Sequence, residues 1–207
     1  MSLMTKAING KIYLSVIIFL TTVLFNSAAA EEKIKAVALS VEEKSPLVVY
    51  YSRSGNTRVV AEALSEAMDA ERFQIKSKKN REGGFGVFTC VFDQLMDRDD
   101  EQFSLSIDLS QYGAVFIASP IWIHKLSSPV RTFIKNASLE GKEVYFVLTY
   151  NGNQSDEDEK ELADSISSLG IKIKGLYKIN TSKKDKKELK QEVVNLVSLF
   201  YGRFVKR

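Results

Sequence analysis

Cysteine and histidine are nearly absent from this 207-residue chain, which has only Cys90 and His124. A single cysteine can form neither an internal disulfide nor a cysteine-based metal cluster. A single histidine excludes a multi-histidine metal site and any mechanism that needs two histidines. We therefore expect no metal centre. Cys90 lies in a segment with helical periodicity, and we interpret it as a small packing residue rather than a reactive thiol.

The chain also lacks a strong excess of charge. Its net charge is +3, from 29 basic and 26 acidic residues, and the first thirty residues contain Lys6, Lys11 and no acid. This balance gives no argument for nucleic acid as a partner. Hydrophobic residues make up 44% and charged residues 27% of the chain, as in ordinary soluble domains. The length suits one sizeable core rather than two domains.

Residues 1–30 differ from the rest of the chain. Lys6 and Lys11 precede an uncharged run that is most apolar from Leu14 to Phe25 and ends in small residues with an Ala-x-Ala pattern. These are the three parts of a secretory signal, so we predict export to the periplasm or the medium. An uncleaved membrane anchor is the alternative, and it would be the chain's only contact with a membrane. Residues 31–46 are predicted to be a linker and residues 47–207 the folded domain.

The most informative stretch runs from Leu47 to Ala67. It opens with the apolar run Leu47–Tyr51, typical of a strand buried on both faces. It closes with apolar residues at helical spacing, from Val59 to Ala67. Between them lies a small, hydroxyl-rich loop, Ser52-Arg53-Ser54-Gly55-Asn56-Thr57. A loop of this kind at a helix N-terminus can bind an anion through backbone N–H groups and hydroxyls. The simpler interpretation is an ordinary helix cap.

Residue by residue, the stretch resembles the phosphate loop of the flavodoxin-like family. Val48, Val49, Tyr50, Ser52, Gly55, Thr57 and Ala61 match every fixed position of that pattern. The resemblance implies that residues 52–57 surround the phosphate of FMN.

A second match follows the apolar run Ala114–Ala118. Ser119-Pro120-Ile121-Trp122-Ile123, with Pro129 to Phe133 in the next predicted helix, is similar to the segment that forms one wall of the flavin pocket in this family. We expect a loop over residues 119–127, with Ser128 capping the helix. The alternative is that Ile121, Trp122 and Ile123 fold back over the core. His124 is interpreted as a surface residue, with a proton donor near the flavin as the alternative.

The third loop of the family follows the fourth strand. Here it is Thr149-Tyr150-Asn151-Gly152-Asn153, which has one glycine where the family often has two. By resemblance, Thr149, Tyr150, Asn151 and Gly152 would approach the flavin ring.

Five predicted strands (47–51, 72–76, 114–118, 143–150 and 171–179) alternate with five predicted helices, which indicates a three-layer α/β/α domain with a parallel sheet. A flexible connector is expected at Gly83–Gly86. The resemblance implies a flavodoxin-like fold with strand order 2-1-3-4-5 and a ligand site at the crevice between the first and third strands.

The resemblance implies an FMN protein of redox function. The family includes electron carriers and enzymes that reduce quinones with NAD(P)H, so the chain's status as an enzyme stays open. For an exported protein we expect a redox partner protein or a small quinone-like acceptor. The alternative is a flavodoxin-shaped ligand-binding protein without redox turnover.

Overall fold

The computed structural model describes residues 45–199, except residues 80, 82, 97 and 101–106. The predicted signal segment, nearly all of the predicted linker and the end of the last predicted helix lie outside the described residues. Within the described part of the chain, every helix is too short or too polar to span a membrane.

Five parallel strands form the sheet. They are β1 (Leu47–Tyr50), β2 (Glu71–Gln74), β3 (Ala114–Trp122), β5 (Glu143–Tyr150) and β6 (Ile173–Asn180), paired in the order β2-β1-β3-β5-β6. This is the predicted order 2-1-3-4-5. The short β4 (Lys125–Leu126) pairs antiparallel with the end of β3. β1, β3 and β5 are central, and their uninterrupted apolar runs are buried on both faces, as parallel strands require.

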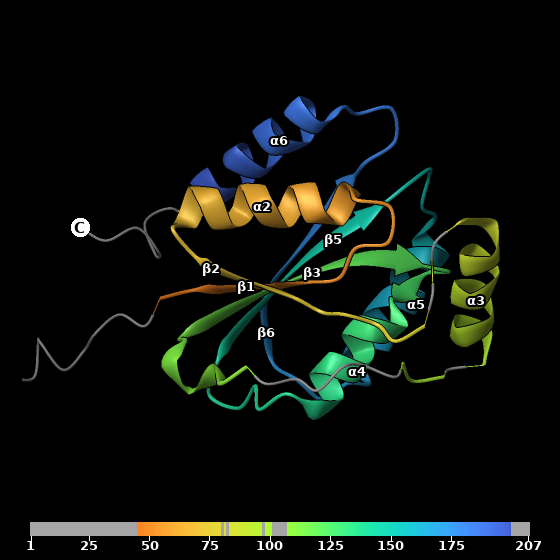
Figure 1. Cartoon of the computed structure of the whole chain (residues 1–207), viewed down its shortest axis with the longest axis horizontal. Helices are drawn as coiled ribbons and strands as arrows, with labels where there is room; N and C mark the ends of the chain where they lie inside the picture. The colour runs from red at the N-terminus through yellow and green to blue at the C-terminus, as the bar shows by residue number, and fades with distance from the viewer. Residues whose placement is uncertain (1–44, 80, 82, 97, 101–106, 200–207) are drawn as a thin grey trace, which may run out of the picture. The chain divides into compact units, whose positions relative to one another are not determined.

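Helices cover both faces of the sheet and confirm the predicted three layers (Figure 1). On one face lie α2 (Asn56–Met68) and α6 (Lys186–Ser198), and on the other lie α4 (Ser128–Asn136) and α5 (Asp156–Ser167). A 3₁₀ turn at Leu109–Gln111 precedes β3. The remaining helix, α3 (Gly83–Leu95), lies beyond the carboxyl end of β3 rather than over a face of the sheet.

An apolar core lies between the sheet and the helices on each of its two faces. One lies between the sheet and α2 with α6, and it includes Leu64, Phe116 and Val193. The other lies between the sheet and α4 with α5, and it includes Phe133 and Ile166. Burying one such side chain contributes about 1.5–3 kcal/mol. The two cores fix the sheet, so the loops at its carboxyl edge rest on a rigid support.

Three local predictions were wrong. The segment 119–127 is a hairpin, because β3 continues to Trp122 and turns back through Ile123 and His124 into β4. Both turn residues have positive φ, 43° and 57°, the requirement of a type I′ turn. Asn-Gly is the usual signal for that turn, and Ile-His does not resemble it. The cap of α4 is Ser127, one residue earlier than predicted. The glycines expected to form a connector instead begin α3.

Candidate functional site

The carboxyl ends of β1, β3 and β5 meet at one edge of the sheet, and all three loops singled out in the sequence lie there. In open parallel sheets, ligands bind outside these ends, at the point where the strand order reverses. Here that point lies between β1 and β3, because β1 leads outward to β2 whereas β3 leads to β5 and β6.

The first loop places Gly55 directly before α2. Gly55 has φ 100°, a left-handed conformation that glycine adopts without strain. Its N–H donates to Ser52 Oγ at 3.1 Å, which closes the loop into a compact turn. The first N–H groups of a helix have no partner within the helix, so the turn presents donors and the positive end of the helix dipole at one place.

A cation that the sequence analysis missed lies against this turn. Arg58 Nη2 is 3.8 Å from the position that a Cβ on Gly55 would occupy. Arg58 directly follows Thr57, the matched threonine of the loop. Its position in the first turn of α2 could have been noticed, but the direction of its side chain required the structure. An anion in the loop would meet backbone donors, hydroxyls and this guanidinium together.

The first and third loops are joined by a buried hydrogen bond. Thr57 Oγ1 lies 2.7 Å from Thr149 Oγ1, and the two residues are only 2% and 3% exposed. Either hydroxyl can be the donor. If Thr149 donates to Thr57, the Thr57 proton remains available for a ligand in the loop.

Thr181, directly after β6, is a second junction that the sequence did not reveal. Asn56 Nδ2 donates to Thr181 Oγ1 at 3.1 Å. The Thr181 hydroxyl also contacts the Tyr150 carbonyl at 3.1 Å and Asn151 Oδ1. Gly152 is held from the same side, since its N–H donates to Ser182 Oγ at 2.6 Å. These bonds hold the first and third predicted loops together.

The second segment reaches this edge through Trp122. The indole makes an edge-on contact with Tyr51, with ring centroids 5.6 Å apart and an interplanar angle of 89°. Tyr51 directly precedes the first loop. Trp122 is half-buried and packs against the core on the α4 and α5 side, as does Ile121. Pro120 is half-buried in β3, and Ile123 forms the turn. Trp122 is thus both a neighbour of the loop and a cover for the core.

His124 points to α5. Its Nδ1 lies 2.9 Å from Asp158 Oδ1, and its side chain is 40% exposed. The pKa of Asp158 is lowered, chiefly by the hydrogen bond from the Ser155 backbone N–H and to a smaller degree by His124. Lys125 pairs with Glu161 at 3.4 Å. The hairpin is therefore held to α5 by the His124–Asp158 contact and the Lys125–Glu161 ion pair, and the His124 side chain lies at the surface.

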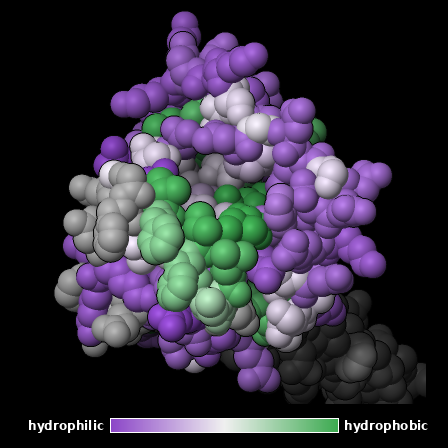
Figure 2. Space-filling model, turned by 90° about the vertical axis from the view of Figure 1, so that its right-hand side faces the viewer, coloured by the Kyte–Doolittle hydropathy of each residue, from purple (hydrophilic) through white to green (hydrophobic). Residues whose placement is uncertain are grey.

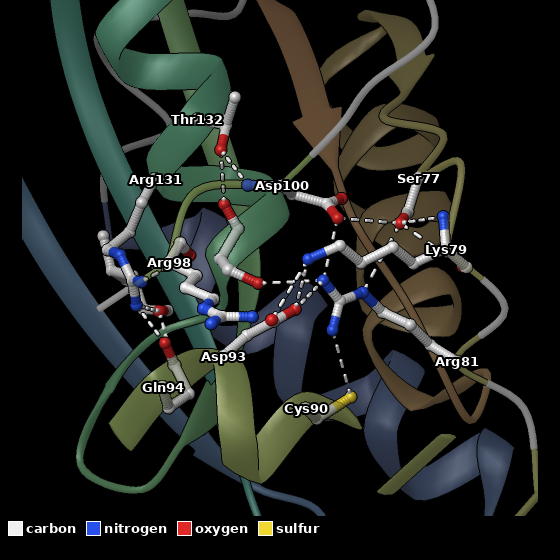
Figure 3. Close-up of polar contacts among 12 residues, drawn as sticks. Ser77, Lys79, Arg81, Cys90, Asp93, Gln94, Arg98, Asp100, Arg131 and Thr132 are labelled. Carbon is white, nitrogen blue, oxygen red and sulfur yellow. Dashed lines mark hydrogen bonds and ion pairs between the residues drawn. The ribbon is translucent and has the colours of Figure 1, made fainter. Parts of the chain in front are cut away.

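A buried polar cluster surrounds Arg81 (Figure 3), and the Arg81 guanidinium carbon lies 5.4 Å from the centre of the Trp122 ring. The Arg81 side chain is 2% exposed, and its Nη2 donates to Asp93 at 2.6 Å and to Asp100 at 2.8 Å. Lys79 Nζ pairs with Asp93 at 3.0 Å. Two positive and two negative groups therefore balance one another. Arg81 Nη1 also lies 3.8 Å from the Cys90 sulfur. Burial raises the pKa of the Cys90 thiol, which agrees with a packing role.

The orientation of α3 is the reverse of that of an ordinary surface helix. Its buried residues include Cys90, Asp93 and Gln94, whereas its exposed residues include Val87 (43%), Phe88 (64%) and Leu95 (68%), with Met96 (58%) just beyond its end. Figure 2, which views the side of the molecule where α3 lies in Figure 1, shows hydrophobic side chains gathered on this face. Polar contacts rather than apolar burial therefore set the rotation of α3.

Comparison with solved structures identifies the architecture. Over 73% of this chain and 99% of the other, it superposes on a candidate flavoprotein from Bacteroides uniformis ATCC 8492 with a TM-score of 0.60 and 21% sequence identity. A candidate flavoprotein from Bacteroides eggerthii DSM 20697 gives a TM-score of 0.59 at 20% identity, over 78% of this chain and 99% of the other. The chain has a flavodoxin-like fold.

A flavoprotein in complex with FMN from Lactobacillus acidophilus NCFM has the same fold, with a TM-score of 0.52 and 20% identity over 65% of this chain and 93% of the other. A comparison with protein-family models and a search of curated proteins found no match. At these identities the superpositions establish the flavodoxin-like fold alone. The chemistry of the site has to be argued from the residues themselves.

Proposed function

We propose that this chain is an FMN-binding redox protein. The observation that supports the proposal most is the junction of the first and third loops at the N-terminus of α2. There Thr57 meets Thr149, and Thr181 contacts both Asn56 and the third loop. The loop offers hydroxyl and amide donors, helix N–H groups and the Arg58 guanidinium, but no acidic side chain between Ser52 and Arg58. This set of donors fits a phosphate dianion.

The two parts of FMN, the phosphate and the flavin ring, would contact different residues. Ser52, Ser54, Asn56, Thr57 and the adjoining N–H groups would hold the phosphate, with Arg53 and Arg58 adding positive charge. Trp122 and the third loop, Tyr150 to Gly152, would border the flavin ring. An indole face excludes water and gives apolar contact to such a ring. Bound FMN would accept and donate electrons, while the chain sets its affinity and its reduction potential.

Export belongs to the same proposal. The basic, apolar and Ala-x-Ala parts of residues 1–30 support a periplasmic or secreted location. Outside the cytoplasm a redox partner protein, or a small quinone-like acceptor, would exchange electrons with the flavin. N-terminal sequencing of the protein from its native host should find a start near Glu31. An intact N-terminus in the membrane fraction would show an anchor instead.

Flavin titration tests the binding proposal. The protein is stripped of bound ligand and titrated with FMN and with riboflavin, which lacks the phosphate. Hydrogen bonds to a charged group contribute about 1.5–3 kcal/mol each, so Ser52→Ala with Thr57→Ala should weaken FMN binding at least about tenfold per hydroxyl. Riboflavin affinity should change little. Ser168→Ala, which removes an exposed hydroxyl that donates to the Ser165 carbonyl at the end of α5, is the matched control.

Equal losses of affinity for FMN and riboflavin in the Ser52→Ala, Thr57→Ala variant would show that this loop does not bind the phosphate. Failure of the unaltered protein to bind either flavin would overturn the proposal as a whole. Binding of FMN without a reversible reduction would leave a ligand-binding protein that has no redox turnover.

A further inference from the structure

We propose that buried Arg81 is a positioning residue that fixes the indole of Trp122 at the edge of the ligand site. The inference rests on the proposed function only where it concerns flavin, because the contact itself involves this chain alone. The Arg81 guanidinium carbon lies 5.4 Å from the centre of the Trp122 ring, within the range of a cation–aromatic interaction. Tyr51 contacts the same indole. The ring therefore has a neighbour from each of two other segments.

Arg81 can act in this way because its own position is fixed on several sides. Asp93 and Asp100 bind Nη2, and Ser128 Oγ accepts from the same nitrogen at 3.2 Å. The other two nitrogens also have partners, since Nε lies 3.4 Å from Ser77 Oγ and Nη1 lies 3.8 Å from the Cys90 sulfur. A planar group held at all three nitrogens has little rotational freedom. Gly86 packs directly against the main chain of Arg81, where a Cβ at position 86 would overlap the Arg81 carbonyl group. This contact restricts the backbone of Arg81. The cation is consequently fixed beside the indole.

Helix α3 joins the cation to the main chain of Trp122. Asp93 binds Arg81, and the next residue, Gln94, donates through Nε2 to the Trp122 carbonyl at 3.0 Å and to the Leu126 carbonyl at 2.8 Å. Arg131 on α4 bonds both Gln94 Oε1 and the Leu126 carbonyl. The polar face of α3 is therefore buried because it holds the hairpin that presents Trp122. This accounts for a helix that is turned with its apolar residues outward.

The test needs a variant that removes the cation without leaving charges buried. Replacing a buried ion cluster with neutral groups of similar volume is often tolerated, whereas removing one partner is not. The variant is therefore Arg81→Met with Asp93→Asn and Asp100→Asn in the full chain. Lys79 then loses its partner Asp93, but its side chain is 29% exposed and keeps access to water. The matched control is Lys135→Met with Asp99→Asn, which removes an exposed ion pair that does not contact Trp122.

Trp122 is the only tryptophan, so the intrinsic emission reports on it alone. In the flavin-free triple variant we expect the emission to shift to longer wavelength and acrylamide quenching to increase, with a thermal midpoint close to that of the unaltered protein. FMN and riboflavin affinity should fall together by roughly two- to tenfold, because binding must then order an indole that Arg81 no longer holds in place. The control should match the unaltered protein in all of these measurements.

A folded triple variant with unaltered emission, quenching and flavin affinity would overturn the inference. Changed emission with unaltered flavin affinity would show that Arg81 positions Trp122 without affecting the flavin site, and it would overturn that part of the inference. If the triple variant does not fold, the Arg81→Lys variant provides the test. Lysine keeps the charge but loses the planar group and the contacts that Nε and Nη1 make with Ser77 and Cys90. Emission and quenching like those of the unaltered protein in that variant would overturn the inference. If no flavin binds to any form, the proposed function fails while the emission still tests the positioning.

Discussion

The hydrogen bond between Thr57 and Thr149 allows a sharp test of how the ligand loops are joined. The oxygens are 2.7 Å apart and both residues are buried. Thr57→Val keeps the shape but leaves the Thr149 hydroxyl without this partner, which costs about 1–3 kcal/mol. Thr149→Val should cost a similar amount. With both replaced, neither hydroxyl is left unpaired, and the stability should return close to that of the unaltered protein.

Urea unfolding of the flavin-free protein measures these free energies, and the four proteins form a double-mutant cycle. Each single variant should also melt lower, by roughly 2–4 °C for each kcal/mol in a domain of this size. The double variant, although stable, should bind FMN more weakly than the unaltered protein and riboflavin about equally well. Losses in the double variant equal to the sum of the two single losses would show that the hydroxyls do not pair, and the reasoning would be wrong.

Three further predictions concern single positions. Gly55→Ala places a side chain at φ 100°, so we expect the free energy of unfolding in denaturant to fall by about 1–3 kcal/mol and FMN to bind more weakly. An unchanged free energy of unfolding would show that the turn has another conformation. Trp122→Ala should weaken FMN and riboflavin binding together, and it should cost less stability than the roughly 3–5 kcal/mol of a fully buried aromatic, because the ring is half-buried. A large drop in the melting temperature of the flavin-free protein with unaltered flavin affinity would show that Trp122 does not contact the flavin. The Ser155 N–H lowers the pKa of Asp158 in the folded protein below its ordinary value of 3.8. The ionised carboxylate therefore stabilises the fold above pH 3.8, and this stabilisation is lost as the pH falls through the folded pKa. Asp158→Asn should flatten the acid side of a plot of stability against pH, and an unchanged acid side would contradict this.

The fold was largely predictable because its signals are local. β1, β3 and β5 are apolar without interruption, and the helices between them keep a helical period, so the alternation is visible in the sequence. Periodicity cannot give the order of the strands, which came from the resemblance of the loop motifs. The β3–β4 hairpin was missed because its turn is Ile123-His124, and a β-branched residue at positive φ is unusual.

The candidate site was predictable only as separate loops. Their residues were named from motifs, but the bonds that join them link distant parts of the chain. Asn56 and Thr181 are 125 positions apart, and Thr57 and Thr149 are 92 apart. Arg81 lies in a polar, basic stretch that resembles an exposed loop. Nothing local indicates that its charge is buried between Asp93 and Asp100, which belong to later segments.

Calorimetric titration of the flavin-free protein with FMN, riboflavin and inorganic phosphate tests the central claim most directly. The account predicts that FMN binds with one site per chain, that riboflavin binds more weakly, and that phosphate competes with FMN but not with riboflavin, since only the phosphate contacts residues 52–57. Equal affinity for FMN and riboflavin, with no effect of phosphate on either, would contradict the claim that this loop is a phosphate site.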